Sequence, residues 1–208
     1  DAALKELEAR ITAAEAECRK AADIVTASRH KAARVLEERV VTTLRMLGME
    51  DAQFVVEISE AATFTPLGRD SIVYLFTANR TTKPGNVERI ASGGELSRIM
   101  LAIKSLLAER RMLPTVIFDE IDTGVSGRIA DAMGDIIAHL AKSMQIIDIT
   151  HLPQVASKSG SHFVVYKTEG RTNIRRLAKS ERIDEIAKML SGSEITDAAR
   201  KQAKILLS

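Results

Sequence analysis

Hydrophobic and small residues recur at alternating steps of three and four along residues 1–47. The repeat occupies Leu4, Leu7, Ile11, Ala14, Cys18, Ala21 and Val25, continues through Ser28, Ala32 and Val35, and then shifts to Leu36, Val40, Leu44 and Leu47. A repeat of about 3.5 residues is typical of a coiled-coil seam, and a helix of this length would extend about 70 Å. The pattern therefore predicts one helix of a coiled-coil arm. A single amphipathic helix lying on a globular core is the alternative.

The pattern changes after Gly48, the first glycine of the chain, where shorter elements begin. Residues 54–58 and 72–76 are rich in β-branched and aromatic side chains and predict strands. The other predicted elements are a helix at 95–111, a strand at 115–118, a helix at 126–142, a strand at 145–149, a hairpin of 162–167 with 172–177, and two short helices with a break near Gly192. A strand, a helix and a strand in succession predict an α/β fold with a parallel strand pair.

The composition limits the classes of protein that fit. The chain has 208 residues, of which 45% are hydrophobic and 28% charged, and this excludes wholesale disorder. Aromatic residues make up only 3%, which argues against a nucleic-acid binder built on stacked aromatic side chains. The single cysteine, Cys18, cannot form an internal disulfide, and this suits a reducing cytoplasm.

The chain shows no targeting segment. Its apolar stretches are too short to span a membrane, and no signal peptide opens it. It begins at Asp1, and no methionine precedes Met46. We therefore expect an excised fragment of a cytoplasmic protein that has no membrane partner.

Two acidic residues follow an apolar predicted strand. Asp119 and Glu120 directly follow Val116-Ile117-Phe118, which places both carboxylates at the carboxyl edge of the sheet, where open α/β folds bind ligands. In phosphoryl-transfer proteins one such carboxylate holds Mg²⁺ and another group orients the attacking water. Taken alone, the pair fits a solvated strand end equally well.

A glycine-rich segment, Ser92-Gly93-Gly94-Glu95, opens the predicted helix at 95–111. Glycines let a backbone approach a ligand closely, and the free N–H groups at the start of a helix attract phosphate. Ser92 adds a hydroxyl donor. Taken alone, the segment fits a plain helix cap better than a phosphate contact.

His151 follows the predicted strand at 145–149. We expect it at the same sheet edge as Asp119 and Glu120, where its imidazole can donate a hydrogen bond to a phosphate oxygen. An isolated histidine is more often structural than functional. Its position one crossover after the acidic pair favours a functional role.

Together these segments resemble the ABC-type ATPases. Ser92 to Glu95 are similar to the signature loop, residues 116–120 to the Walker B strand, Thr123-Gly124-Val125-Ser126 to the D-loop, and His151 to the switch histidine. More narrowly, residues 91–102, 117–127, 149–154 and 189–194 resemble the RecN family of SMC-like bacterial DNA repair proteins. The resemblance covers essentially the whole chain. It implies the carboxyl-terminal lobe of an ABC-type head, with a mostly parallel sheet flanked by helices, and a long amino-terminal coiled-coil helix.

The resemblance also implies a role for each matching residue. Asp119 would hold Mg²⁺ through water, Glu120 would polarise the attacking water, and His151 would contact the γ-phosphate of ATP. The signature loop of Ser92, Gly93, Gly94 and Glu95 would reach the ATP of a second head, and the D-loop of Thr123, Gly124, Val125 and Ser126 would line the junction. ATP and Mg²⁺ are thus the implied cofactors. ATP would hold two heads together, and hydrolysis would release them.

In that family the head is split along the sequence, and an amino-terminal lobe carries the phosphate-binding loop. No G-x-x-x-x-G-K-[ST] segment occurs in this chain. We therefore expect residues 1–47 to be the returning helix of the arm and residues 48–208 to be the carboxyl-terminal lobe. The amino-terminal lobe and a second head are the expected partners, and this chain alone is expected to be inactive as an ATPase.

DNA is a further implied partner, with a function in double-strand break repair and recombination at the nucleoid. The charge supports DNA binding only weakly, because 30 Lys and Arg residues against 28 Asp and Glu residues leave a net charge of +2. Basic residues gather around the predicted hairpin, at Lys167, Arg171, Arg175, Arg176, Lys179 and Arg182. A solvated hairpin accounts for them better than contacts with phosphates.

Two other functions stay open. One is the head of another SMC-family chromosome-organising or repair protein, which the length of the coiled-coil arm would distinguish. The other is a non-catalytic coiled-coil adaptor with a decayed ATPase fold. The intact acidic pair, signature serine and switch histidine argue against decay.

Overall fold

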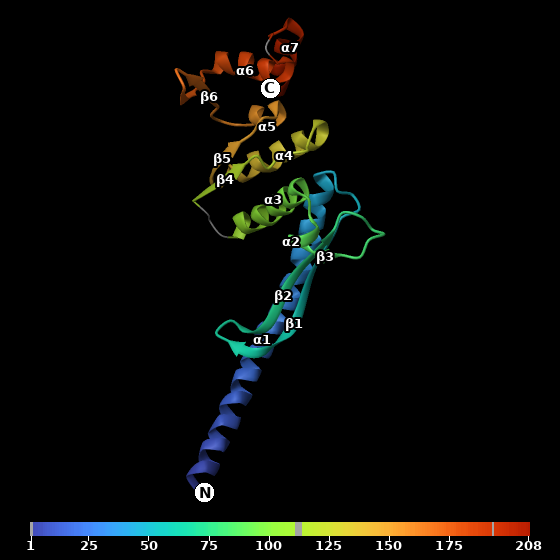
Figure 1. Ribbon diagram of the computed structural model, residues 1–208, viewed down its shortest axis with the longest axis vertical. Coiled ribbons are helices and arrows are strands. Elements are labelled where there is room, and N and C mark those ends of the chain that lie inside the picture. The colour runs from blue at the N-terminus through green and yellow to red at the C-terminus, as the bar shows by residue number, and fades with distance from the viewer. Residues whose placement is uncertain (1, 111–113, 193) are drawn as a thin grey trace. The chain divides into compact units, whose positions relative to one another are not determined.

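The computed structural model describes residues 2–110, 114–192 and 194–208. The chain divides into two compact units (Figure 1). The first comprises residues 1–45 and 49–91, and the second comprises 46–48 and 92–208. Both units combine helices with strands, as the sequence predicts.

The first unit contains a long helix and a small antiparallel sheet. Its elements are α1 (Ala2–Met46, which runs on into the second unit), β1 (Gln53–Thr65), β2 (Gly68–Thr77), β3 (Gly85–Asn86) and α2 (Val87–Ile90). The helix predicted over residues 1–47 is confirmed as α1. The strands predicted at 54–58 and 72–76 are confirmed, but β1 and β2 extend further, because they pair as a hairpin almost to the turn at Thr65 and Gly68. The short elements β3 and α2 were not predicted.

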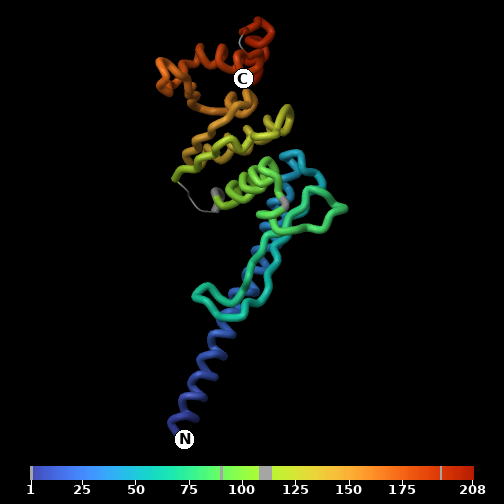
Figure 2. The backbone as a smooth tube through the Cα atoms, in the orientation of Figure 1, coloured from blue at the N-terminus to red at the C-terminus, as the bar shows by residue number. Residues whose placement is uncertain are grey.

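The β1–β2 hairpin runs along α1 (Figure 2), and polar contacts fasten it there. Asp70 accepts hydrogen bonds from Thr26 Oγ1 and Arg29 Nη1, both at 2.7 Å. Arg69 forms ion pairs with Asp23 of α1 and with Glu60 of the neighbouring strand. The contacts with Asp23, Thr26 and Arg29 join the hairpin to one stretch of α1.

Two different stripes run along α1. The buried residues Ala22, Ala33, Val40 and Leu44 lie on the stripe that also carries Thr26 and Arg29. From Leu4 to Val35 the predicted coiled-coil seam lies beside it and is exposed: Leu4 is 59% exposed and Val35 48% exposed. The last predicted seam positions, Val40 and Leu44, belong to the buried stripe instead. Nothing among the described residues covers the part from Leu4 to Val35, so a coiled coil at these positions stays a prediction.

The second unit contains a parallel strand pair, a hairpin and helices. Its elements are α3 (Gly93–Arg110), β4 (Thr115–Asp119), α4 (Gly127–Leu140), β5 (Gln145–Ile149), α5 (Pro153–Ser157), β6 (Phe163–Thr168), β7 (Arg171–Arg176), α6 (Lys179–Ser191) and α7 (Asp197–Leu206). The predicted strand–helix–strand unit is confirmed, because β4 and β5 pair in parallel and α4 connects them. β6 and β7 form the predicted antiparallel hairpin. The short helix α5 was missed, and the predicted helix end at residue 111 lies outside the described residues.

The core of the second unit lies on one face of the β4–β5 pair. Val116 and Phe118 alternate along β4 and are buried, and they pack with the apolar side of α4, which includes Met133 and Ile137. A smaller cluster joins α5, α6 and α7 around Ala156, Ile186 and Ala203. Burial of such side chains stabilises the fold by roughly 1.5–3 kcal/mol for each large one.

The opposite face of the β4–β5 pair is apolar but uncovered. Ile117 is 58% exposed, and Ile147 and Ile149 are 45% and 51% exposed. Parallel sheets are ordinarily covered on both faces. Among the described residues no element provides this second layer.

Candidate functional site

The candidate site lies at the carboxyl edge of the β4–β5 pair. Asp119 is the last residue of β4 and lies opposite Ile149, the last residue of β5. Glu120 follows directly, and its backbone N–H donates to Ile149 O at 3.0 Å. His151 is two residues beyond Ile149. The structure therefore brings the three residues predicted for this edge to neighbouring strand ends.

Glu120 has an unusual backbone conformation. Its φ angle is +47°, in the left-handed region that side-chain-bearing residues rarely adopt. Such strain persists where the surrounding structure imposes it, and it is frequent at functional sites. The Glu120 side chain is exposed at the edge of the sheet, where a carboxylate can reach a ligand.

The residues after Glu120 form a tight turn that leads into α4. Thr123 donates from Oγ1 to Glu120 O at 2.9 Å, and Val125 N–H donates to Asp122 O at 3.1 Å. Val125 is buried in the core, whereas Thr123, Gly124 and Ser126 are exposed. The predicted D-loop is thus a hydrogen-bonded turn with three exposed positions.

The predicted signature loop is a reciprocal helix cap at the start of α3. Ser92 N–H donates to Glu95 Oε2 at 2.8 Å, and Glu95 N–H donates to Ser92 Oγ at 3.4 Å. The helix cap, which the sequence analysis gave as the alternative to a phosphate contact, is therefore present. It leaves the Ser92 hydroxyl exposed, so a cap and a ligand contact are compatible.

The two glycines of this loop serve different purposes. A Cβ atom on Gly94 would lie 2.9 Å from Thr123 O, which is too close, so glycine here lets α3 pack against the D-loop. A Cβ atom on Gly93 would meet nothing within 4 Å. Gly93 is therefore the one of the two that leaves the backbone open to an incoming group. Sequence reasoning assigned both glycines to a ligand and missed the packing role of Gly94.

Two aspartates with buried side-chain oxygens lie behind the edge, and sequence reasoning missed both as site residues. Asp122 is 1% exposed, and one of its oxygens accepts a hydrogen bond from Thr150 Oγ1. Asp148 lies on the buried face of β5, opposite Phe118, and neither of its oxygens has a hydrogen-bond partner among the described residues. Burial first, and then the charge of Asp122, raise the pKa of Asp148 to about 6. A signal was present, since Asp148 interrupts an otherwise apolar strand.

The residues at the edge fit a nucleotide-bound magnesium ion. Mg²⁺ in phosphoryl-transfer sites is commonly held by one or two carboxylates together with waters and substrate phosphates. Asp119 supplies one exposed carboxylate. No three His, Cys, Asp or Glu side chains gather into a metal site within the described residues, so an ion here would depend on ligands from the nucleotide.

The basic residues near the β6–β7 hairpin are partly engaged in the fold. Arg175 pairs with Glu181 at 2.8 Å, and Arg176 donates to Ser161 Oγ. Arg182 donates to the backbone oxygens of Ser157 and Ser159. These contacts favour the solvated hairpin over a surface dedicated to phosphates.

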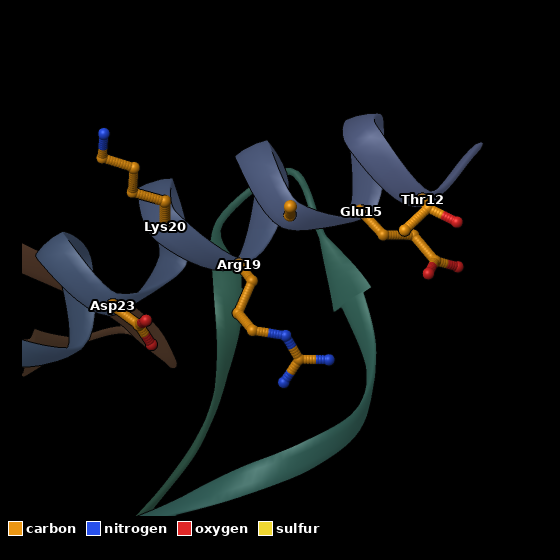
Figure 3. A pocket seen from close by; sticks show the side chains of 6 residues that line it. Thr12, Glu15, Arg19, Lys20 and Asp23 are labelled. Carbon is orange, nitrogen blue, oxygen red and sulfur yellow. The ribbon is translucent and has the colours of Figure 1, made fainter. Parts of the chain in front are cut away.

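A pocket on α1 has no features of an active site. It is lined by Thr12, Glu15, Ala16, Arg19, Lys20 and Asp23, all on one helix (Figure 3). The Arg19 and Lys20 side chains point to different sides of the helix. A small-molecule site needs walls that enclose most of the ligand, and one helix does not provide them.

The chain is similar in sequence to RecN DNA repair proteins. It is 44% identical over 192 residues to the DNA repair protein RecN of Rickettsia prowazekii, a match that covers 90% of this chain and 35% of that protein. It is 37% identical over 191 residues to RecN of Haemophilus influenzae, with 89% and 34% covered. The predicted resemblance to RecN is confirmed, and the chain spans about a third of the length of these curated relatives. No protein-family model matches it.

The fold resembles solved SMC heads. A structure from work on ATP-driven dimerization and DNA-stimulated activation of SMC ATPases covers 79% of this chain and 96% of its own, with a TM-score of 0.54 at 15% identity. An Smc head domain with a coiled coil and joint from Pyrococcus yayanosii covers 79% of this chain and 30% of its own, with a TM-score of 0.62 at 16% identity. At such identities the likeness shows the fold alone. It confirms the predicted α/β head fold with a long helix. No helix in the part of the chain that the structure describes is long and apolar enough to cross a membrane.

Proposed function

We propose that this chain, a homologue of about a third of a RecN DNA repair protein, is the carboxyl-terminal lobe of an ATP-hydrolysing head together with one helix of its arm. The observation that carries the proposal is the joint position of Asp119, Glu120 and His151 at one sheet edge. The same unit holds the cap of α3 against the D-loop, through Gly94 and Thr123. The whole protein would act in double-strand break repair and recombination, in the cytoplasm at the nucleoid.

Each residue at the edge has a chemical task. Asp119 would hold Mg²⁺ through a water of its shell, and Glu120 would accept the proton of the water that attacks the γ-phosphorus as the bond to ADP breaks. His151 donates a hydrogen bond to a γ-phosphate oxygen. Bound Mg²⁺ neutralises the charge of the phosphates. Glu120 combines a left-handed backbone with an exposed side chain just past the end of β4.

The signature loop serves the nucleotide of a second head. Ser92 and Gly93 are exposed at the amino end of α3, where backbone N–H groups and the helix dipole favour an anion. The D-loop, Thr123 to Ser126, packs beside this end of α3 and would line the junction between heads. Two ATP molecules would thus hold two heads together, in keeping with the ATP-driven dimerization named for a structurally similar SMC ATPase.

An amino-terminal lobe would complete the head. The exposed isoleucines Ile117, Ile147 and Ile149 leave one face of a parallel strand pair uncovered, and a second layer is what such pairs ordinarily have. The β6–β7 hairpin also has an uncovered apolar face, since Val165 and Ile174 lie opposite each other across it and are 63% and 68% exposed. That lobe would also bring the phosphate-binding loop, so this chain alone would neither bind nor hydrolyse ATP.

The arm and DNA complete the proposal. The exposed seam of α1, from Leu4 to Val35, would pack against an outgoing helix as residues 1–47 return to the head. DNA would be the substrate of the assembled protein, as the name of its relatives implies. Because three arginines near the β6–β7 hairpin bond within the chain, we do not assign the DNA contact to that hairpin.

The proposal is tested by the variant Ser92→Arg in a full-length protein that contains this chain. Each head should still bind ATP, because its own phosphate loop is intact. Dimerisation on ATP and hydrolysis should fail together, because the bulky cation blocks the approach of phosphate to the loop. Ser143→Arg, at an exposed serine just before β5 and so at the opposite sheet edge, is the matched control and should behave as the wild type.

A mixing experiment separates action on the opposite head from action on the same head. Ser92→Arg protein is mixed with protein defective in its own phosphate loop. One composite site then joins two intact halves, and partial hydrolysis should return. Loss of ATP binding by isolated Ser92→Arg heads would contradict action in trans, and wild-type hydrolysis by this variant would reduce Ser92 to a helix cap.

A further inference from the structure

Asp122 is a buried carboxylate with an unused oxygen. Its side chain is 2% exposed, and Oδ2 accepts a hydrogen bond from Thr150 Oγ1. Oδ1 is buried and has no hydrogen-bond partner among the described residues. Leaving a buried acceptor unsatisfied is costly, more so when it is charged. We therefore expect Asp122 Oδ1 to accept a hydrogen bond from a nearby donor.

His151 is placed to be that donor. Its Nδ1 lies 3.6 Å from Asp122 Oδ1, while 63% of the His151 side chain is exposed. One ring nitrogen thus faces a buried carboxylate and the rest of the ring faces out. A distance of 3.6 Å exceeds that of a formed hydrogen bond. Catalytic hydrogen bonds are often long in ligand-free proteins and shorten when substrate binds.

The carboxylate is itself held in place. Thr150, the residue before His151, donates to Asp122 from its hydroxyl and accepts from Leu152 N–H at 3.0 Å. The same threonine thus ties Asp122 to the start of α5. Asp122, Thr150 and His151 form one connected group that joins the turn after β4 to the turn after β5.

We propose that Asp122 is a positioning residue for His151. Its Oδ1 accepts Nδ1–H, which fixes the plane of the ring and turns Nε2 outward from the sheet edge. For Nε2 to donate to a γ-phosphate oxygen while Asp122 holds Nδ1–H, both ring nitrogens must carry a proton, and the carboxylate would then balance the charge of the ring. A carboxylate behind a functional histidine sets its tautomer and orientation in this way. This inference rests on the phosphate contact proposed above for His151.

The first test reads the tautomer of His151 directly, by ¹⁵N NMR of this chain at about pH 9, where a free imidazole is neutral. The chain has four histidines, so the loss of one signal in His151→Gln assigns the resonance. We expect Nδ1–H to predominate in the wild type and Nε2–H in Asp122→Ala. Asp148→Asn, which removes the neighbouring buried carboxylate, should leave the tautomer unchanged. The proposal would be overturned if Nε2–H were the predominant tautomer of His151 in the wild type. It would also be overturned if Asp122→Ala had the same tautomer as the wild type.

The second test is a double-mutant cycle on ATP turnover in a full-length protein that contains this chain. Asp122→Ala and His151→Ala should each lower kcat by roughly 10-fold, with little change in KM. The double variant should be no slower than His151→Ala alone, because Asp122 acts only through the histidine. If the loss of kcat in the double variant equalled the product of the two single losses, Asp122 would have a separate structural role, and this would contradict the proposal.

Two outcomes of these experiments would need a second variant or measurement, and the proposal can be tested in both cases. If Asp122→Ala does not fold, Asp122→Asn keeps the shape of the side chain and removes its charge, and kcat should still fall; an unchanged kcat would contradict the role of the carboxylate. If His151→Ala turns over ATP like the wild type, the proposed phosphate contact fails. The NMR result then still decides, by itself, whether Asp122 holds the ring.

Discussion

Two buried aspartates, one in each unit, have opposite surroundings. The Asp70 side chain in the hairpin of the first unit is 3% exposed, and each of its oxygens accepts a hydrogen bond, from Arg29 and from Thr26. These hydrogen bonds, that of Arg29 first, hold the pKa of Asp70 below its ordinary value. Asp122 in the second unit is as deeply buried, yet one of its oxygens has no hydrogen-bond partner among the described residues.

The difference separates a carboxylate that holds the fold, Asp70, from one whose open oxygen faces a residue of the candidate site, Asp122. Asp70 joins the hairpin to α1, and its charge is fully balanced there. Asp122 and its neighbour Asp148 lie behind the edge that carries Asp119 and Glu120, and burial first, then the charge of Asp122, raises the pKa of Asp148. Buried groups left unsatisfied and with shifted pKa values are concentrated at functional sites. Changing Asp70 should therefore affect stability, and changing Asp122 should affect activity.

The largest effect is expected from Glu120→Gln in a full-length protein that contains this chain. The amide keeps the size of the side chain but cannot accept the proton of water, so kcat for ATP should fall by roughly 10²-fold or more. ATP binding should survive, and the protein should accumulate as an ATP-bound dimer, measurable by light scattering. Glu169→Gln is the matched control, because Glu169 also has a left-handed backbone, with a φ angle of +52°, but lies in the β6–β7 turn. Unchanged turnover in Glu120→Gln would show that this carboxylate is not catalytic.

Asp70→Asn should loosen the hairpin of the first unit. The amide cannot pair with the Arg29 guanidinium, so amide hydrogens of β1 and β2 should exchange with solvent faster, as measured by mass spectrometry. Asp51→Asn breaks an exposed ion pair with Arg80 and should have little effect. Equal protection in Asp70→Asn and the wild type would show that the polar contacts do not fasten the hairpin.

Acid should have the same effect as Asp70→Asn. Because the pKa of Asp70 is lower in the folded chain than its ordinary 3.8, the contact stabilises the hairpin above about pH 4. The stabilisation should fade as the pH falls through the folded-state pKa.

The smallest effect is expected from Asp148→Asn. This variant should stabilise the folded chain, whereas Asp70→Asn should destabilise it. The pKa of Asp148 is raised from 3.8 to about 6, so between these values the folded chain binds more protons than the unfolded chain, and stability falls as the pH rises. Above about pH 6 the ionised carboxylate costs about 1–2 kcal/mol, allowing for its partial exposure. Asp148→Asn should therefore be more stable than the wild type at pH 8, and the advantage should vanish near pH 4. Urea unfolding of both proteins at the two pH values measures this, and an advantage that is equal at both would contradict the assignment.

Local pattern was enough for much of the fold. The periodicity of α1, the apolar run of β4 that ends at Asp119, and the parallel β4–β5 pair all follow from neighbouring residues. The short α5 was missed because five residues from Pro153 to Ser157 are too few to show a helical period.

The contacts that define the site were beyond local pattern. Asp122 meets Thr150 across 28 positions of sequence, and Arg29 meets Asp70 across 41. No spacing rule brings such pairs together, because only the packed fold does so. Gly94 was assigned to a ligand for the same reason, since its close neighbour Thr123 is known only once α3 and the D-loop are packed.

Calorimetry with ATP tests the central claim most directly, which is that this chain supplies the catalytic edge of a head but not its phosphate-binding loop. Mg²⁺-ATP titrated into the purified chain should give no heat of binding. The same titration into the chain co-expressed with the amino-terminal lobe should give saturable binding, followed by Mg²⁺-dependent hydrolysis. Tight binding of ATP by the chain alone would contradict the split head, and so would a co-expressed complex that binds no ATP.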